Sequence, residues 1–556
     1  MKNTSTNNYS FVLVFVVTTI LVSTQAYAQD KTSEIDKIFN WTKPNEPGCA
    51  VAASQNGKVV INRAYGSADL ERDVPISPNT VFDAGSVRKQ FVAAAILLLV
   101  EEGKLSLADD VRKHIPQLPD YGHKITVDHL LTHTSGIRDW QTLLNLAGGD
   151  PDAMTMILRQ RETNFVPGDE WAYSNSNYVL LPEIVTRVSG MPFSEFARKR
   201  LFEPLGMKST THPEDPLYLI KNRALAYKKE AGAWKMDMYL GNDRGGAGGL
   251  FTTAADLVTW NDALSNNRLG AFVTKMLQEP ATLNNGRKLN YARGLNIELR
   301  PGRGGKLVWH SGGAAGYSAL AGYLPEHGLS VAIMCNLDGG ARSAYASRVF
   351  DLFLPPDTPS ANTSATNSVA VAPADLSGRA GLFFDEKTGQ PLQITVNNNN
   401  LAIAGGGPLV ALAYDRFRNQ RPTLFFMSGA EFELQFLSTK QIEIKTKDGI
   451  TTQYRRAEGY SPTGDDLRAF TGRYYSDELM AVFEATPGKD SLMVRANDSP
   501  RALLEFKPVT RDTFQIGASL LRFNRDKAGK VVGLEYSNPL LRNVKFARLN
   551  DRTTSR

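Results

Sequence analysis

Apolar positions in the N-terminal part of the chain follow the two periods that distinguish strands from helices. Residues 48–66 (GCAVAASQNGKVVINRAYG) hold two strand-like runs around the turn Gln55–Gly57. Residues 91–100 are almost continuously apolar, which predicts a helix buried on most of its faces. Helical and loop patterns occupy residues 125–280, and strand patterns return in LVWHSGG, SALAGYLP and LSVAIMCN. This order predicts one α/β domain whose first and last strands share a sheet.

Beyond this domain the composition changes and a repeat follows. Residues 354–374 are rich in Pro, Ser, Thr, Asn and Ala, which is typical of a linker. DLSGRAGLFF begins at Asp375 and DLRAFTGRYY at Asp466, so the two phrases start 91 residues apart. Short alternating strands and turns follow each phrase, which predicts two small antiparallel all-β barrels over 375–458 and 466–550. Small barrels are usually filled by their own side chains, so we expect a structural or interface role for both.

The N-terminal segment has the pattern of an export signal. Residues 11–22 are apolar but too few to span a bilayer comfortably, and Lys2 precedes them. Ala26 and Ala28 place small residues at the two positions that a signal peptidase reads. We therefore expect residues 1–28 to be a signal peptide, with an uncleaved anchor as the alternative. The mature chain is expected to be exported, periplasmic or secreted, with no membrane span after cleavage.

Length, charge and cysteine content narrow the function only slightly. The chain has 556 residues, and 63 Lys and Arg against 57 Asp and Glu give a net charge of +6. This length suggests roughly two to four domains. A small excess without a long basic run gives no argument for nucleic acid. Cys49 and Cys335 lie in strand-like runs. Export would permit a bridge, but two cysteines make no disulfide framework or structural zinc site, and we expect buried free thiols.

The first candidate for chemistry is the pair Ser86 and Lys89, just before the apolar helix. Residues at i and i+3 lie on one face of a helix, so the lysine can reach the serine hydroxyl. In a dry site the ammonium group gives up its proton easily and can act as the base that activates the serine. The backbone N–H of a serine at a helix start can also point at an oxyanion. The alternative is a serine that caps the helix beside a surface lysine.

Two further segments can complete a site. Tyr173 in PGDEWAYSNSNYVLL can pass a proton between a nucleophile and a leaving group, and Asn175 can donate to a substrate carbonyl. The strand VWHSGGAAGYSALAGYLP carries His310, Gly312 and Gly313. Its small residues let a substrate backbone lie alongside, and its N–H groups can complete an oxyanion hole. A glycine-rich strand needed only for packing is the alternative.

The order of these motifs resembles a known group. AGSVRKQF, LLTHTSGI, YSNSNYVLL, LGM, GGLFTTAADL and HSGG occur, over roughly residues 35–350, in the order found in the serine β-lactamase and penicillin-binding protein superfamily. The chain is similar to the branch that holds class C β-lactamases, D-alanyl-D-alanine carboxypeptidases, D-aminopeptidases and related esterases. This resemblance implies a β-lactamase-like catalytic domain over residues 29–353, with an antiparallel sheet flanked by helices.

The resemblance also implies roles for the candidate residues. It makes Ser86 the nucleophile of an acyl-enzyme mechanism and Lys89 and Tyr173 its acid/base partners. Asn175 and His310 are then expected near the substrate. Which group takes the serine proton is disputed among relatives, so Lys89 and Tyr173 are left coupled.

Departures from the β-lactamase pattern narrow the resemblance. That pattern has Lys-Thr-Gly where this chain has His310, Ser311 and Gly312. A lysine there helps to hold a carboxylate, whereas a histidine is mostly neutral at pH 7. His-x-Gly at this position is similar to the D-aminopeptidases and to several esterase-like members, and two C-terminal barrels resemble the D-aminopeptidases. We therefore expect an exported serine hydrolase for small peptide-like or ester substrates, D-aminopeptidase-like in its best interpretation. A class C-like β-lactamase, a D-alanyl-D-alanine carboxypeptidase or an esterase is the enzymatic alternative, and a penicillin-binding-like sensor or binder is the non-enzymatic one.

The sequence gives no reason to expect a metal or another cofactor. His129 and His133 are spaced as a helical metal pair, but no glutamate lies between them. GGAGGL, residues 245–250, lacks the phosphate-loop lysine and the dinucleotide spacing. It predicts a close approach of backbone to the site instead. We expect a small-molecule substrate and no nucleic acid, and a homodimer is left open.

Overall fold

The structure is a computed structural model, and it describes the following residues: 31–215, 217–237, 249–300, 305–337, 342–355, 372–387, 389–397, 399–403, 408–419, 432–446, 449–457, 460–497, 503–538 and 540–549. The expected signal peptide lies outside these ranges, as do most of the expected linker and most of the GGAGGL segment. Within the described ranges, no helix combines the length and the apolar character needed to cross a bilayer.

Residue contacts divide the chain into two compact units, and each is described by itself. Unit 1 comprises Met1–Ile115, Ile125–Thr132 and Tyr178–Ser360. Unit 2 comprises Pro116–Lys124, His133–Asn177 and Ala361–Arg556. An internal segment of 45 residues, His133–Asn177, thus groups with the C-terminal part of the chain. The domain boundaries expected from the sequence stay predictions.

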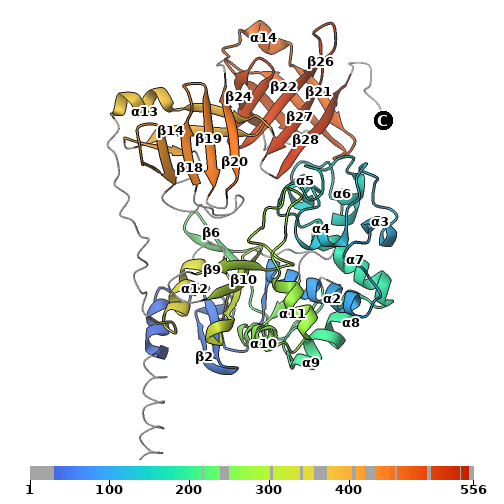
Figure 1. Cartoon of the computed structure of the whole chain (residues 1–556), viewed down its shortest axis with the longest axis vertical. Helices are drawn as coiled ribbons and strands as arrows, with labels where there is room; N and C mark the ends of the chain where they lie inside the picture. The colour runs from blue at the N-terminus through green and yellow to red at the C-terminus, as the bar shows by residue number, and fades with distance from the viewer. Residues whose placement is uncertain are drawn as a thin grey trace, which may run out of the picture. The chain divides into compact units, whose positions relative to one another are not determined.

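The core of unit 1 is an antiparallel six-stranded sheet with the order β2-β1-β12-β11-β10-β9 (Figure 1). Its strands are β1 (Cys49–Gln55), β2 (Lys58–Tyr65), β9 (Asn296–Leu299), β10 (Lys306–Ala314), β11 (Tyr317–Leu324) and β12 (Leu329–Cys335). Strand β1 pairs with β12 over its full length, which confirms that the first and last strands share a sheet. Asn56 and Gly57, both at positive φ, make the tight turn between β1 and β2.

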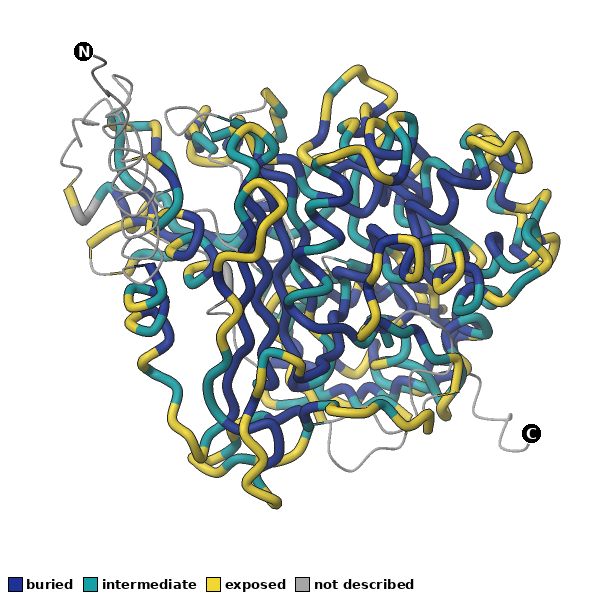
Figure 2. The backbone as a smooth tube through the Cα atoms, turned by 90° about the horizontal axis from the view of Figure 1, so that it is seen from below, coloured by how far each residue is buried: buried dark blue, intermediate teal, exposed yellow. Residues whose placement is uncertain are grey.

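Helices cover both faces of this sheet. The Ser54 hydroxyl of β1 donates to Asp262 of α10 (Ala254–Ser265) at 2.7 Å. The alternate strand residues point the other way, and Val331 packs in one apolar cluster with residues of α12 (Arg342–Asp351). Every residue of β11 and β12 is buried, and the burial of the backbone can be followed in Figure 2. Two-sided coverage explains why these strands are almost continuously apolar.

The apolar helix lies on the α10 face. It is α2 (Lys89–Glu101), preceded by the 3-10 turn η1 (Gly85–Arg88), and its residues up to Leu99 are buried. The ring of Phe91 lies 4.1 Å from that of Trp260 of α10, measured between centroids. The remaining elements of this unit are α3 (Val111–His114), α4 (Val127–Leu131), α7 (Asn177–Ser189, whose first residue belongs to unit 2), α8 (Phe193–Ala197), η2 (Arg198–Phe202), α9 (Glu203–Leu205), α11 (Ala271–Gln278), η3 (Pro325–His327), β3 (Ser67–Asp69), β4 (Val74–Pro75), β5 (Phe82–Asp83), β6 (Tyr227–Glu230), β7 (Ala233–Met236) and β8 (Phe251–Thr252).

The expectation of free thiols is wrong. Cys49 and Cys335 face each other directly in the antiparallel register of β1 and β12, and they form a disulfide. Both are buried in the apolar cluster under α12. The bridge joins positions 286 residues apart. Separate strand-like runs in a sequence carry no register, so the pairing could not be read from the two cysteines alone.

Unit 2 contains two antiparallel β-structures, as the repeat predicts. The first is an eight-stranded sheet with the order β15-β14-β13-β20-β19-β18-β17-β16, and the bridge Ala402–Pro408 links its two ends. The second is a closed barrel of β21 to β28. The strands of the first are β13 (Gly381–Asp385), β14 (Pro391–Asn397), β15 (Asn400–Ile403), β16 (Leu409–Ala411), β17 (Arg416–Asn419), β18 (Phe432–Phe436), β19 (Gln441–Thr446) and β20 (Thr451–Arg456); those of the second are β21 (Gly472–Ser476), β22 (Ala481–Pro487), β23 (Leu492–Ala496), β24 (Leu503–Thr510), β25 (Thr513–Ile516), β26 (Ser519–Arg525), β27 (Val531–Asn538) and β28 (Leu541–Arg548).

The repeated phrases mark equivalent places in the two β-structures. A short helix precedes the first strand of each β-structure: α13 (Pro373–Arg379) precedes β13, and α14 (Gly464–Arg468) precedes β21. Each helix buries one leucine, Leu376 or Leu467. The segment His133–Asn177 of the same unit adds the helices α5 (Trp140–Leu144) and α6 (Ala153–Arg159).

Candidate active site

Ser86 and Lys89 are in contact. Ser86 lies within η1, Lys89 is the first residue of α2, and the Nζ of Lys89 donates to the Oγ of Ser86 at 3.1 Å. Lys89 is 1% exposed, so it is no surface lysine. The N-cap of η1 is Ala84 and that of α2 is Arg88, so Ser86 caps neither helix. The pair has the arrangement of a nucleophile beside a buried amine that can serve as its base.

The glycines of β10 lie against the backbone that carries Ser86. A Cβ atom on Gly312 would stand 1.9 Å from the carbonyl oxygen of Ala84 and 3.0 Å from the backbone nitrogen of Ser86. A Cβ atom on Gly85, where φ is +51°, would stand 2.6 Å from the nitrogen of Gly313. Side chains at these positions would push the two backbones apart. The glycines of β10 therefore pack against the backbone of η1, and the approach of a substrate backbone to Gly312 and Gly313 stays a prediction.

His310 shares the face of β10 with Gly312, and it is 4% exposed. Its Nδ1 lies 2.6 Å from the carbonyl oxygen of Ser311, and its Nε2 lies 3.1 Å from the hydroxyl of Tyr291. A carbonyl only accepts, so Nδ1 carries the proton and Nε2 accepts from the tyrosine. Burial, together with the nearby charge of Lys89, lowers the pKa of His310 to about 3. His310 is therefore neutral at pH 7.

The Tyr173 segment belongs to unit 2, and His133 organises it. The Nδ1 of His133 accepts from the backbone N–H of Ser174 at 3.2 Å, and its ring centroid lies 4.4 Å from that of Tyr173. The backbone N–H of Asn175 donates to Asp139 at 2.7 Å, and its side-chain amide donates to Gln141 at 2.8 Å. The approach of Tyr173 and Asn175 to Ser86 stays a prediction.

Four residues of unit 1 that contact candidate site residues or their neighbours were missed from the sequence: Arg88, Tyr178, His212 and Tyr291. Arg88 is buried, and its guanidinium contacts Nε2 of His212 at 2.8 Å and donates to the carbonyl of Tyr178 at 3.0 Å. The ring of Tyr178 lies 5.4 Å from the Nζ of Lys89. Burial, with the charge of Arg88, lowers the pKa of His212 to about 3. Arg88 lies within the motif AGSVRKQF and Tyr178 within YSNSNYVLL, whereas Tyr291 lies in a segment with no recognisable pattern.

The two histidines spaced as a metal pair have other roles. Nδ1 of His129 accepts from the backbone N–H of Thr126, and the Thr126 hydroxyl accepts from the backbone N–H of His129. Thr126 and His129 therefore form a capping box at the start of α4. His133 holds the Tyr173 segment. Among the described residues, no group of three or more His, Cys, Asp or Glu side chains forms a metal-binding cluster.

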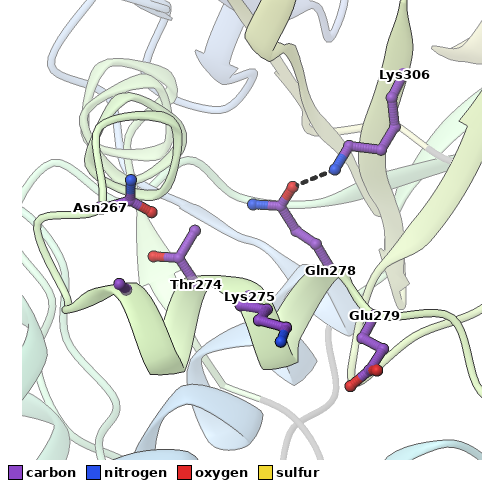
Figure 3. Close-up of a pocket in the computed structure, with 7 residues that line it drawn as sticks. Asn267, Thr274, Lys275, Gln278, Glu279 and Lys306 are labelled. Atoms are coloured by element: carbon purple, nitrogen blue, oxygen red, sulfur yellow. Dashed lines mark hydrogen bonds between the residues drawn. The ribbon is translucent and has the colours of Figure 1, made fainter.

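A polar surface pocket of unit 1 lies beside α11 (Figure 3). The Nζ of Lys306, one of the residues that line the pocket, donates to Gln278 at 2.7 Å (Figure 3). None of its lining residues is a predicted site residue; they are Asn267, Ala271, Thr274, Lys275, Gln278, Glu279 and Lys306. The pocket therefore adds nothing to the serine centre.

A known protein family matches more than half of the chain. Residues 36–352 match the family described as Beta-lactamase. The chain belongs to this family. It is a serine hydrolase, because the relatives it matches within the beta-lactamase family are serine hydrolases.

Relatives of this beta-lactamase family member extend over most of its length. It is 27% identical to the D-aminopeptidase of Brucella anthropi, over 90% of this chain and 95% of that protein. It is 26% identical to penicillin-binding protein 4* of Bacillus subtilis (strain 168), over 73% of this chain and 94% of that protein. The shared length with the D-aminopeptidase includes the C-terminal β-structures.

Solved structures show the same fold. The octameric penicillin-binding protein homologue from Pyrococcus abyssi matches 78% of this chain and 100% of its own, with a TM-score of 0.51 at 24% identity. The crystal structure of SurE matches 94% of this chain and 99% of its own, with a TM-score of 0.51 at 19% identity. These likenesses and the family confirm a β-lactamase-like fold followed by two antiparallel β-structures.

Proposed function

We propose that this chain is an exported serine hydrolase that works through an acyl-enzyme on Ser86 and acts as a D-aminopeptidase on small substrates. The observation that carries the proposal is the 3.1 Å hydrogen bond between Lys89 Nζ and Ser86 Oγ in a buried setting. Ser86 attacks the substrate carbonyl carbon, and its proton passes to the coupled acid/base pair of Lys89 and Tyr173. The amide or ester bond then breaks, and water releases the acyl group from Ser86.

The backbone around Ser86 supports the same reaction. Gly312 brings β10 against the nitrogen of Ser86, and this closeness supports an oxyanion site shared by backbone N–H groups of the two segments. Fixed donors of this kind stabilise the developing charge without reorganising during the reaction. We assign that role to the N–H of Ser86 and a β10 N–H.

Tyr173 is the proposed donor to the leaving group. Its place in YSNSNYVLL, one of the motifs that carry the resemblance to the family, supports this role. Asn175 is the proposed donor to the substrate carbonyl. Lys89 and Tyr173 are coupled in this scheme, and the proton balance is complete when the leaving amine takes the proton that Ser86 gave up.

The neutral state of the His310 imidazole indicates which substrate group can bind beside it. A β-lactamase or carboxypeptidase holds a substrate carboxylate, and a neutral imidazole offers no full charge for this purpose. The pKa of His310, about 3, makes the imidazole neutral over the physiological range. This favours a substrate without a carboxylate at that place, such as a D-amino acid amide or a peptide with a D-residue at its N-terminus. The D-aminopeptidase of Brucella anthropi, similar over 90% of this chain, supports the same choice.

Export is part of the proposal. The apolar N-terminal segment and the AYA site are typical of a signal peptide. The Cys49–Cys335 disulfide is also typical of a protein that matures in an oxidising compartment.

The test is turnover by the purified mature protein and its Ser86→Ala variant. D-alanine p-nitroanilide, a D-Ala-D-Ala peptide, p-nitrophenyl butyrate and nitrocefin are compared as substrates. We expect cleavage of the anilide that Ser86→Ala abolishes, and little cleavage of nitrocefin. Cleavage of nitrocefin or of the D-Ala-D-Ala peptide, with the anilide untouched, would replace the aminopeptidase by a β-lactamase or carboxypeptidase. Cleavage of the butyrate alone would leave an esterase, and no turnover would favour a binder.

A further inference from the structure

The closed barrel contacts the Tyr173 segment at several places within unit 2. The turn between β21 and β22 meets the loop after α5, where the backbone N–H of Gly148 donates to the carbonyl of Leu479 at 3.0 Å. A Cβ atom on Gly148 would stand 2.0 Å from the carbonyl oxygen of Met480, so the two backbones touch. In Figure 1, α5 and α6 lie beside β28.

A buried ion pair is the centre of this contact. The guanidinium of Arg138 donates to the carboxylate of Glu478 at 2.6 Å, and these residues are 1% and 6% exposed. Arg138 also donates to the carbonyl of Arg542 in β28 at 2.9 Å. Breaking a buried ion pair from one side leaves an uncompensated charge, so the arrangement depends strongly on both partners.

The backbone at Arg138 holds the other end of the segment. The hydroxyl of Ser176 donates to the carbonyl of Arg138 at 2.7 Å and accepts from the N–H of Trp140 at 2.9 Å. The next residue, Asp139, accepts from the N–H of Asn175 at 2.7 Å. A continuous set of contacts therefore runs from Glu478 of the barrel to the residue that the proposed mechanism places beside the substrate.

A second ion pair anchors the other flank of Tyr173. Glu170, three residues before Tyr173, makes a two-point contact with the guanidinium of Arg542, at 3.1 and 3.0 Å. The side chain of Asn164 donates to the carbonyl of Leu540 at 2.8 Å and accepts from the N–H of Arg542 at 2.9 Å. The closed barrel thus holds the Tyr173 segment by direct contacts at Asn164 and Glu170, before Tyr173, and through Arg138 and Ser176 after it.

We propose that the closed barrel positions Tyr173 and Asn175 for the reaction, and that Arg138 and Glu478 are positioning residues that act through Asp139 and Ser176. This inference rests on the proposed function, because it assigns the barrel a part in that same site. It requires no contact between the barrel and the substrate. The proposal differs from a purely structural role for the barrel in one consequence. If it is correct, loosening the Arg138–Glu478 pair slows turnover in protein that is still folded.

The test uses full-length mature protein with two variants and a matched control. Glu478→Ala removes the 2.6 Å partner of Arg138 and leaves it the more distant carboxylate of Glu162, at 3.8 Å. The double variant Arg138→Leu/Glu478→Leu removes both charges of the short pair and puts apolar side chains in their place. Glu484→Ala is the control, because Glu484 lies on β22 of the same barrel and forms an ion pair with Arg495 at 2.6 Å. None of the contacts with the Tyr173 segment described above involves this pair.

Two measurements are made on each protein. Hydrogen–deuterium exchange of peptides covering residues 170–177 reports the N–H groups of Ser174 and Asn175, whose acceptors are His133 and Asp139. The turnover of D-alanine p-nitroanilide gives kcat per active serine, with the active serines counted by a fluorophosphonate. We expect both test variants to raise this exchange at least about tenfold and to lower kcat about 10–100-fold, with KM changed less than about threefold. The control should stay within about twofold of the parent in both.

Exchange in residues 170–177 within twofold of the parent in the double variant overturns the inference, even if activity falls. A Glu478→Ala protein that unfolds as a whole leaves the decision to the double variant. Raised exchange with unchanged kcat per active serine also overturns it, since the barrel would then have a structural role alone. If the parent shows no Ser86-dependent turnover, the proposed function fails, and raised exchange still supports the barrel as the anchor of the Tyr173 segment.

Discussion

Replacing Gly312 by alanine tests the close approach of β10 to Ser86. The added Cβ would stand 1.9 Å from the carbonyl oxygen of Ala84. An ordinary contact of about 3.4 Å requires the two backbones to separate by about 1.5 Å. This movement displaces the N–H of Ser86 from any oxyanion that β10 also contacts. A misplacement of about 1 Å costs on the order of 100-fold in rate, so we expect kcat/KM to fall at least about 100-fold, or about 2.7 kcal/mol.

The assay is kcat/KM for D-alanine p-nitroanilide, together with the rate at which a fluorophosphonate labels Ser86. The control is Gly464→Ala, because a Cβ at Gly464 meets nothing within 4 Å and φ there is not positive. Thermal unfolding of each variant separates a local shift from loss of the fold. A Gly312→Ala protein that keeps its kcat/KM and its labelling rate within about threefold would refute the argument that these backbones must touch.

Three other predictions concern stability. His310 and His212 are buried with pKa values of about 3, against an ordinary value of 6.5, so the unfolded chain binds more protons at acid pH. Their contribution to the free energy of unfolding is complete above about pH 6.5 and is lost as the pH falls toward 3. The free energy of unfolding, measured in urea from pH 7 to 4.5, should therefore decrease with falling pH, and His212→Gln should reduce this decrease. A flat profile would contradict the neutral burial of both rings. Tyr291→Phe removes the donor to Nε2 of His310 and should lower the free energy of unfolding by about 1–3 kcal/mol, as measured in urea. Serine at both Cys49 and Cys335 should lower it by about 2–5 kcal/mol, and a change below about 0.5 kcal/mol would contradict a stabilising bridge.

Periodic features of the sequence predicted much of this fold. The alternating runs gave the shared sheet of the first and last strands, and the repeat at Asp375 and Asp466 gave the two β-structures. The contact of Ser86 with Lys89 follows from their spacing, because three residues on a helical turn bring two side chains to one face. In each case the signal is local, or it repeats.

Contacts between distant, non-periodic positions could not be predicted. The pairing of Cys49 with Cys335 depends on register, which the runs themselves do not carry. The pair Arg138 and Glu478, 340 residues apart, gives no signal that an internal segment groups with the barrel. Tyr291 is recognisable as the partner of His310 only once β10 is in place. Long-range side-chain pairing, and not the choice of strand or helix, is what the sequence left open.

The position of β1 in its sheet sets an order of events during synthesis. Strand β2 follows β1 at once, but its other neighbour, β12, begins at Leu329, 274 residues after β1 ends. At a synthesis rate of about 5–20 residues per second, one edge of β1 waits about 15–60 s for its partner. An open edge of this kind is a template for pairing with other chains. A product that stops before β12 therefore carries an unpaired central strand, and termination there should give insoluble fragments and not a smaller folded domain.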